Sequence, residues 1–479
     1  MNRPAHRVVV VGGGVTGLTT AHRLRHADPG LRVTLVEASG RLGGKLVTER
    51  VAGFVLEGGP DALVGFKPAG LALAEELGLT PRLVPADPGS AGTFLADGDR
   101  LRRMPDGFTG FVPRRLWPMV TTPLLPPGAK LRLGLEWAVP AGGPGDESVA
   151  DFVSRRLGRQ FYQRLVEPLV AGIFGADPAE LSLRETLPQL RRAEQAHGSL
   201  TRFVLAERRR AAGAAGPAVS SLLAPVGGMA ELVTALEGAL AGVDVRTSTT
   251  VESVTAEPGG YRVGLAAADG TRSDLPADAV VLAVPAPAAA RAVRTLDAAL
   301  PPVLDQLRYG STVTVNLGFA GDAPPVGGHG YLVPARERRA ARAVTWSSVK
   351  FPGRAPEGHL LARVSLGGPG RSVGQADRED LVALARDELA RIGLTAAPVL
   401  ARVHDWRGAM PSYTVGHSDR VAEIESVLAR HPGLLVAGSA FHGAAVPDCI
   451  VSAGRAADAV VAHLSRTGPP ITGTSARVV

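Results

Sequence analysis

Hydrophobic and polar positions are arranged in short blocks at the start of the chain. Val8 to Val11 is an uninterrupted apolar run, which predicts a strand buried on both faces of a parallel sheet. Apolar residues then recur in helical order from 16 to 26, and a second apolar run spans 33–36. Strand, helix and strand in this order predict a βαβ unit and an α/β fold class.

Glycines in G-x-G-x-x-G spacing, Gly12, Gly14 and Gly17, join the first predicted strand to the helix. The first allows a tight turn, the second a close approach of backbone to a pyrophosphate, and the third close helix packing. Glu37, 20 positions after Gly17, ends the second strand and can accept hydrogen bonds from ribose hydroxyls. The set predicts a dinucleotide site with a free 2′-hydroxyl. The alternative is a glycine-rich loop in an α/β domain that binds no nucleotide.

The residues after Glu37 bear on which dinucleotide is bound. Arg41 and the pair Gly43-Gly44 resemble the extended FAD-binding signature of the amine oxidase–like flavoproteins. A second glycine pair lets another backbone segment approach a long, bent dinucleotide. The turn Gly58-Gly59-Pro60-Asp61 follows, and we expect it to lie against the flavin.

Further blocks predict the remaining elements. An N-terminal cap at Ser148, with Asp151 three positions later, predicts a helix over 149–157. The other predicted strands are 243–246, 250–251 paired with 261–265, 279–284, 312–319, 359–366 and 434–438, and the other predicted helices are 232–240 and 447–463.

Composition narrows the function classes. The single cysteine, Cys449, excludes an intramolecular disulfide and a cysteine-rich metal site. The net charge is +7, but no basic stripe is interleaved with aromatic residues, so we expect no nucleic-acid partner. The uncharged stretch 211–230 is interrupted by glycine and proline and predicts a flexible connection rather than a membrane span. We expect a cytoplasmic protein with at most peripheral membrane contact, and no metal site.

The whole chain, from about residue 6 to 465, resembles the oxygen-dependent protoporphyrinogen/coproporphyrinogen oxidases of haem synthesis, most closely the soluble Gram-positive coproporphyrinogen III oxidases. The selective motifs are Glu167-Pro168-Leu169-Val170-Ala171-Gly172-Ile173 and Val446-Pro447-Asp448-Cys449-Ile450. The resemblance implies a Rossmann-like FAD-binding domain from 1–75, 222–290 and 412–466, a mixed-sheet substrate domain from 76–98, 191–221 and 291–411, and a helical subdomain over 99–190. We expect the tail 467–479 to be loose.

The resemblance also implies an activity. One non-covalent FAD per chain would accept hydride at N5 from a porphyrinogen, and dioxygen would reoxidise it with release of hydrogen peroxide. Six electrons would leave in three flavin turnovers, with no catalytic side chain required. Coproporphyrinogen III is favoured over protoporphyrinogen IX as substrate, because its four carboxylates suit a basic pocket. The other interpretations are a flavin amine oxidase or carotenoid desaturase, and a flavin-free binding protein of the Rab-escort type. Contact with other haem-pathway enzymes is also open.

The resemblance implies a set of cofactor-contacting residues: Gly12, Gly13, Gly14, Val15, Thr16, Gly17, Glu37, Ala38, Arg41, Gly44, Lys45, Gly59, Pro60, Asp61, Ala62, Val251, Trp406, Gly438, Ser439, Ala444, Ala445 and Val446. Trp406 could equally pack an interdomain seam.

Candidate substrate contacts are the cations Lys67 and Arg102, for carboxylates, and Leu317, Phe319 and Leu332, for apolar walls. A solvated lysine and ordinary core packing are the alternatives for these positions. We expect Cys449 to be a small buried thiol rather than a covalent flavin link.

Overall fold

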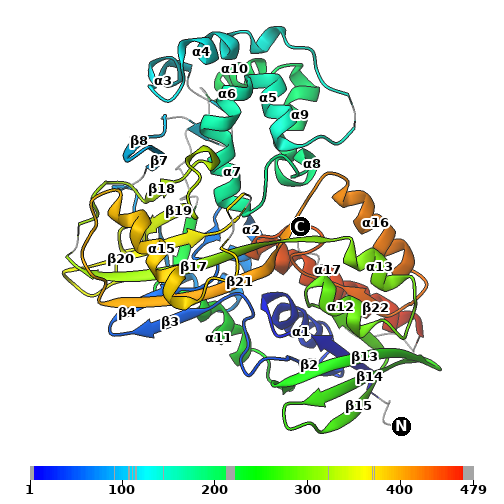
Figure 1. The fold of residues 1–479 in the computed structure, drawn as a ribbon. Helices are drawn as coiled ribbons and strands as arrows, with labels where there is room; N and C mark the ends of the chain where they lie inside the picture. Colours follow the sequence, from blue (N-terminus) through cyan, green and yellow to red (C-terminus); the bar gives the residue numbers. More distant parts are fainter. Residues whose placement is uncertain are drawn as a thin grey trace.

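The structure is a computed structural model that describes residues 5–90, 92–105, 108–109, 112–113, 116–143, 145–211, 222–321, 323–368, 370–371 and 373–467. A parallel sheet with its helices lies at the lower right of Figure 1, a larger mixed sheet at the left, and a helical part above both. Of the predicted connection over 211–230, residues 212–221 lie outside the described residues, whereas 222–225 form a strand, so a flexible connection is wrong for that part. Of the predicted tail over 467–479, residues 468–479 also lie outside the described residues.

The parallel sheet has five strands and is built from stretches far apart in the sequence. β1 (Arg7–Val11) lies at its centre, between β2 (Arg32–Val36) and β16 (Ala279–Leu282). The edges are β12 (Asp244–Arg246) and β22 (Leu434–Val436). Residues Val8 to Val11 are at most 5% exposed, as the apolar run predicts. The predicted strand–helix–strand unit is therefore confirmed.

Helices cover one face of this sheet, and a small sheet with further helices covers the other. The first face packs against α1 (Val15–Ala27), α11 (Ala230–Gly238) and α17 (Val446–Thr467). On the second face lie the antiparallel strands β13 (Thr249–Glu257), β14 (Gly260–Ala267) and β15 (Arg272–Ala277), with α12 (Ala286–Ala292), α13 (Leu300–Asp305) and α16 (His417–Leu428). The two buried faces explain why Val8 to Val11 of β1 and all of β16 carry no polar side chain.

The mixed sheet has seven strands in the order β21-β17-β20-β19-β18-β7-β8, antiparallel except between β18 and β7. Their bounds are β21 (Leu400–Ser412), β17 (Arg308–Ala320), β20 (His359–Leu366), β19 (Ala341–Trp346), β18 (Gly330–Leu332), β7 (Thr93–Asp97) and β8 (Arg100–Arg103). Helix α15 (Arg378–Ala390) packs on one face. The other face meets the parallel-sheet part, for example where Gly318 lies close to Phe54.

The helical part contains α3 (Leu116–Thr121), α4 (Pro127–Gly134), η2 (Glu136–Ala138), α5 (Val149–Leu157), α6 (Arg159–Phe161), η3 (Tyr162–Val166), α7 (Glu167–Phe174), α8 (Leu183–Thr186), α9 (Pro188–His197) and α10 (Leu200–Ala211). The predicted cap is present, because Ser148 Oγ accepts from the backbone N–H of Asp151 at 3.0 Å. Helices α9 and α10 pack into this helical core through Leu190 and Leu200. The structure therefore differs from the expected boundary at 190, since 191–211 joins the helical part and β8 joins the mixed sheet.

Shorter elements connect these parts. They are β3 (Thr48–Val51) paired with β4 (Phe54–Glu57), β5 (Leu63–Val64) and β6 (Leu83–Pro85) on either side of β11 (Leu222–Pro225), β9 (Phe108–Thr109) paired with β10 (Val112–Pro113), and the helices α2 (Pro68–Glu76), η1 (Thr80–Arg82), η4 (Ala335–Glu337) and α14 (Ser347–Lys350). Among the described residues, no helix is both long and apolar enough to cross a bilayer.

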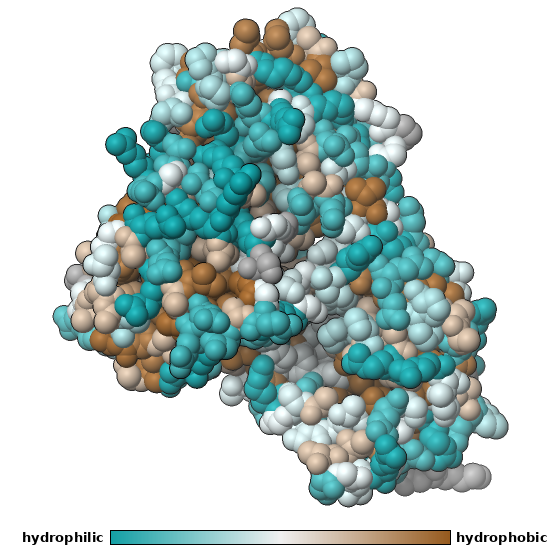
Figure 2. All heavy atoms as spheres, in the orientation of Figure 1, coloured by the Kyte–Doolittle hydropathy of each residue, from teal (hydrophilic) through white to brown (hydrophobic). Residues whose placement is uncertain are grey.

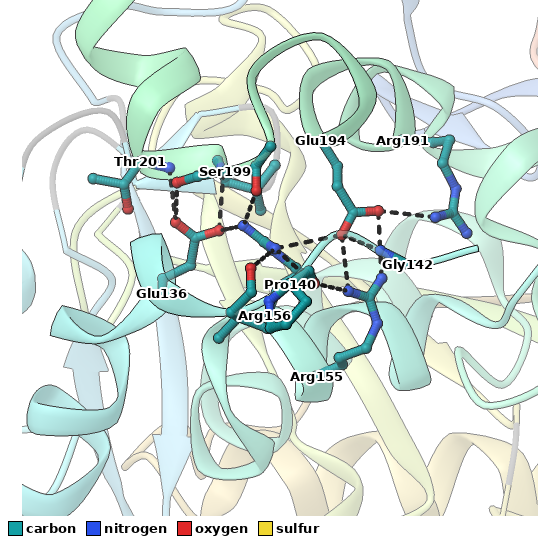
Figure 3. A network of polar contacts seen from close by, with 12 residues as sticks. Glu136, Pro140, Gly142, Arg155, Arg156, Arg191, Glu194, Ser199 and Thr201 are labelled. Carbon is teal, nitrogen blue, oxygen red and sulfur yellow. Dashed lines mark hydrogen bonds and ion pairs between the residues drawn. The ribbon is translucent and has the colours of Figure 1, made fainter. Parts of the chain in front are cut away.

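A buried ion network ties the helical part together (Figure 3). Arg156 on α5 is fully buried and pairs with Glu136 and, at 3.5 Å, with Glu194. Glu194 also pairs with Arg155 and Arg191, each at 2.8 Å. Hydrogen bonds from Ser199 and the N–H of Thr201 offset the effect of burial and lower the pKa of Glu136, so it stays ionised. Arg155, Arg156 and Arg191 thus have a structural role in the helical part.

Candidate functional site

The glycine turn after β1 has the geometry that its spacing predicts. Gly12 has φ of 105°, and a β-carbon on Gly17 would lie 1.8 Å from the carbonyl oxygen of Gly12. Any side chain at Gly17 would therefore force α1 away from β1. A β-carbon on Gly14, in contrast, would meet only Gly44, at 4.0 Å. The turn leaves open space at Gly14, at the N-terminus of α1, where a phosphate is favoured.

Glu37 lies beside this turn. Its Oε2 accepts from the N–H of Gly13 at 2.6 Å, and its Oε1 accepts from the N–H and hydroxyl of Ser39. The N–H of Thr249 donates to the Glu37 carbonyl, which brings the start of β13, with Val251, next to the predicted ribose site. The two carboxylate oxygens have capacity for further donors such as sugar hydroxyls.

The loop 38–45 closes over the glycine turn. The N–H of Gly43 donates to the Gly13 carbonyl at 2.8 Å, and Arg41 fixes the loop by donating to the Gly44 carbonyl at 2.7 Å. Burial lowers the pKa of Lys45, against the opposing effect of the Cys449 thiol, and no described residue forms an ion pair with it. A half-buried cation without a carboxylate, beside the open space at Gly14, fits a pyrophosphate.

The turn Gly58-Gly59-Pro60-Asp61 is held by side chains from three strands of the mixed sheet. Asn316 of β17 donates to the Glu57 carbonyl at 3.1 Å, Trp406 of β21 to the Gly58 carbonyl at 2.7 Å, and Arg363 of β20 to the Gly59 carbonyl at 2.6 Å. The indole of Trp406 thus joins the mixed sheet to the turn that follows β4, which matches the interpretation that Trp406 packs an interdomain seam. With three carbonyls anchored from behind, the turn presents a fixed backbone surface.

Asp61 ends this turn within a cluster of cations. Lys350 pairs with it at 2.7 Å and Arg363 at 3.7 Å. Burial alone would raise the pKa of Asp61, but these two charges lower it to about 2. Asp61 is therefore a structural counter-ion that fixes the turn, and Ala62 follows it.

The C-terminal loop completes the arrangement. Gly438 lies against Thr16 at the start of α1, and the hydroxyl of Tyr413 donates to the Ser439 carbonyl and accepts from the N–H of Gly443. Ala444 and Ala445 lead into Val446, the first residue of α17. The start of α17 thus lies close to the start of α1. The two starts are far apart in the sequence, so only the structure shows that they are neighbours.

Two residues near this loop, Cys449 and Lys67, are limited in their chemistry, the first by burial and the second by an ion pair. Cys449 is 6% exposed, and burial raises the pKa of its thiol to about 11. A buried thiol is therefore confirmed. Lys67 pairs with both oxygens of Asp448 at 2.7 Å, so this proposed carboxylate contact already has a counter-ion.

The other proposed substrate contacts lie on three different strands of the mixed sheet. Arg102 pairs with Asp97 on β7 at 2.5 Å. Leu317 and Phe319 are at most 1% exposed and pack toward α15, on the face of β17 opposite to Asn316, which favours core packing for both. Leu332 of β18 lies between the mixed sheet and the helical part. A β-carbon built on Gly172 of α7 would lie 2.8 Å from its side chain.

The sequence interpretation missed Asn316, Lys350 and Arg363. Two of them carried a detectable signal, because Asn316 and Arg363 are polar residues inside apolar strands. Among the described residues, His22, His26 and Glu76 bring possible metal ligands within 4.8 Å of one another. Glu76 Oε1 lies 2.8 Å from His22 Nε2, and Glu76 also pairs with Arg23 at 2.7 Å.

Comparisons with known proteins agree with this geometry. The chain matches the family described as "Flavin containing amine oxidoreductase" over residues 15–461. It is 37% identical to a coproporphyrinogen III oxidase of Propionibacterium freudenreichii subsp. freudenreichii, over 95% of this chain and 90% of the relative, and 31% identical to that of Bacillus subtilis, over 92% and 95%. A crystal structure named "Putative protoporphyrinogen oxidase from Exiguobacterium sp. 255-15" superposes with a TM-score of 0.86 and 30% identity, covering 97% of this chain and all of that one.

A putrescine oxidase superposes with a TM-score of 0.67 at 18% identity, which supports the fold alone. The site geometry and the family match together support a flavin cofactor and an oxidoreductase. The chain belongs to the flavin-containing amine oxidoreductase family, and two relatives that are 37% and 31% identical over nearly its whole length are named coproporphyrinogen III oxidases.

Proposed function

We propose that this chain oxidises coproporphyrinogen III to coproporphyrin III, with one non-covalently bound FAD per chain and release of hydrogen peroxide. The observation that carries the proposal is the 37% identity to a coproporphyrinogen III oxidase over 95% of the chain, and it is supported by a site in which the segments predicted to contact the nucleotide lie together. When bound, FAD supplies the hydride acceptor, and dioxygen is the final oxidant.

The chain's own contribution is to bind and orient. The open backbone at Gly14 and the cation of Lys45 would hold the pyrophosphate, Glu37 the ribose, and Val251 the adenine side of the site. The anchored turn from Gly59 to Ala62 would present backbone to the ring system. No side chain is assigned a proton transfer, and the high pKa of the Cys449 thiol supports a non-covalent cofactor.

The experiment is an aerobic fluorescence assay with the two porphyrinogens, since only the aromatic products fluoresce. We expect faster turnover of coproporphyrinogen III. A strong preference for protoporphyrinogen IX would support the alternative substrate, which has its own precedent in a human protoporphyrinogen oxidase that is 32% identical. Peroxide release with polyamines and none with porphyrinogens would favour an amine oxidase. A colourless, flavin-free protein would favour a binding role.

Peripheral membrane contact is the second part of the proposal. Figure 2 shows apolar side chains at the outer end of the helical part. Trp117 is 75% exposed, Trp137 57% and Leu131 70%. Exposed tryptophans are typical of surfaces that meet a bilayer interface. Replacing Trp117 and Trp137 with serine should reduce co-sedimentation with anionic lipid vesicles while turnover of dissolved substrate stays unchanged. Equal co-sedimentation of the variant and the native protein would contradict this part.

A further inference from the structure

Arg342 occupies an irregular position in the mixed sheet. β19 pairs with β20 through Ala341 and Ala343, whose partners Leu366 and Ser365 are adjacent, so Arg342 is the extra residue of a β-bulge. Bulges redirect a side chain out of the regular alternation. The neighbours of Arg342 along β19, Ala341 and Val344, pack into the α15 core, whereas its guanidinium lies beside Gly175 and Gly368.

The guanidinium of Arg342 is a buried cation without a counter-ion. The residue is 9% exposed, and neither Nε nor Nη1 has a hydrogen-bond partner. Within the part of the chain that the structure describes, Arg342 forms no ion pair, and the two charges that act on it, Arg363 and Arg371, are also cations. Burial, with a smaller effect of these two arginines, lowers the pKa of Arg342 to about 10. Such an arrangement is costly unless an anion compensates it.

A cavity of about 540 Å³ lies next to this cation. Gly175 and Gly368 both line it, and β-carbons built on them would lie 3.3 and 3.8 Å from Nη1 of Arg342. Two glycines that line the cavity therefore lie against the guanidinium, without side chains of their own to cover it. A second sheet irregularity, between β17 and β21, brings Arg407 to the same wall.

Two of the arginines that line the cavity already have partners. Arg371 lines it and is held by the carbonyls of Ala341 and Val333, each at 2.6 Å, while Arg407 pairs with Asp405. Two acids, Asp177 and Glu180, also line the cavity, on the side of the helical part. Neither of them reaches Arg342, so the compensating anion has to come from a ligand.

We propose that Arg342 binds a carboxylate of the tetrapyrrole substrate, which reaches it between Gly175 and Gly368. This inference rests on the proposed function and adds the residue that recognises the substrate's acid groups. A guanidinium fork matches a carboxylate in two parallel hydrogen bonds. Leu332 of β18, which pairs with Ala343 next to Arg342, lies against Gly172 and would provide an apolar neighbour for the macrocycle. Lys67 and Arg102, by contrast, are already neutralised.

The test measures equilibrium binding of coproporphyrin III, the stable product, to the flavin-loaded protein by fluorescence. Arg342→Met removes the charge and keeps most of the volume. We expect its Kd to rise at least tenfold, with flavin content unchanged, whereas the tetramethyl ester of coproporphyrin III should bind both proteins equally. Arg342→Lys should give an intermediate Kd for the acid. The matched control is Arg272→Met, an exposed arginine of β15 whose loss changes net charge equally.

Thermal unfolding separates this role from a structural one. Because an uncompensated buried cation is removed, Arg342→Met should keep or raise the Tm of the ligand-free protein. An unchanged Kd, or an equal loss for acid and ester, would overturn the inference. Should Arg342→Met fail to fold, Arg342→Lys carries the test, and an acid Kd equal to that of the native protein overturns it. If the native protein binds no coproporphyrin III at all, the proposed function itself fails.

Discussion

The buried network of the helical part allows a quantitative prediction about stability. Arg156 is fully buried and donates to the carbonyls of Val139 and Gly198, at 2.7 and 3.1 Å, as well as to Glu136. Arg156→Met would leave those carbonyls without a donor and remove the main counter-charge of a fully buried carboxylate. Losing one partner of a buried ion pair costs about 3–5 kcal/mol.

The loss should be local, because the network joins η2, α5, α9 and the start of α10 and does not reach the parallel sheet. We would therefore measure hydrogen exchange of amides in α5 and α17 in the native protein and the variant. A cost of about 3–5 kcal/mol corresponds to a fall in α5 protection of about two to nearly four powers of ten. Protection of α17 and flavin content should change little.

Arg192→Met is the matched control, because Arg192 is an exposed arginine of the same region with no ion pair among the described residues. It should change α5 protection by less than about threefold, as expected for a surface substitution within about 0.5 kcal/mol. If Arg156→Met lowers α5 protection by less than tenfold, the network does not stabilise the helical part in the way its geometry indicates.

Three further predictions concern the cofactor side of the molecule. Gly17→Ala should abolish flavin retention, because its β-carbon would lie 1.8 Å from the Gly12 carbonyl oxygen. The control Gly238→Ala has open space at its β-carbon and should keep the full flavin absorbance spectrum. Equal flavin content in both variants would contradict the close packing at Gly17. The pKa of Asp61 is lowered to about 2, so its stabilising effect is present above pH 4 and is lost as the pH falls toward 2. The Tm difference between native protein and Asp61→Asn should therefore shrink over that range, and a constant difference would exclude the ion pair as its cause. With its pKa raised to about 11, Cys449 should resist iodoacetamide near neutral pH until the protein is denatured, as intact mass would report, and rapid alkylation of folded protein would refute its burial.

Local patterns predicted the nucleotide half of the fold well. The apolar run at Val8 and the glycine spacing report directly on a doubly covered parallel strand and a tight turn, because both depend on neighbouring residues. The cap at Ser148 is local for the same reason. Tertiary placement was harder, since α9 spans the predicted boundary at 190 and α10 follows it, yet Ala193 and Leu200 beyond that boundary are buried in the helical core.

The substrate side could not be predicted from the same signals. Lys67 and Arg102 are plausible carboxylate ligands as residue types, but their counter-ions Asp448 and Asp97 are visible only in three dimensions. Arg342 is the opposite case, because the structure leaves its guanidinium without a counter-ion. Its lack of a partner depends on a bulge in β19 and on two glycines from other elements, and no sequence period encodes that combination.

Oxidation of a porphyrinogen by this flavoprotein can be measured in a single reaction. Purified yellow protein is mixed in air with coproporphyrinogen III, and porphyrin fluorescence and hydrogen peroxide are followed together. Fluorescence should rise with three peroxides formed for each porphyrin, at a rate well above spontaneous oxidation. Fluorescence that rises no faster than in a protein-free control, with the flavin present, would contradict this activity.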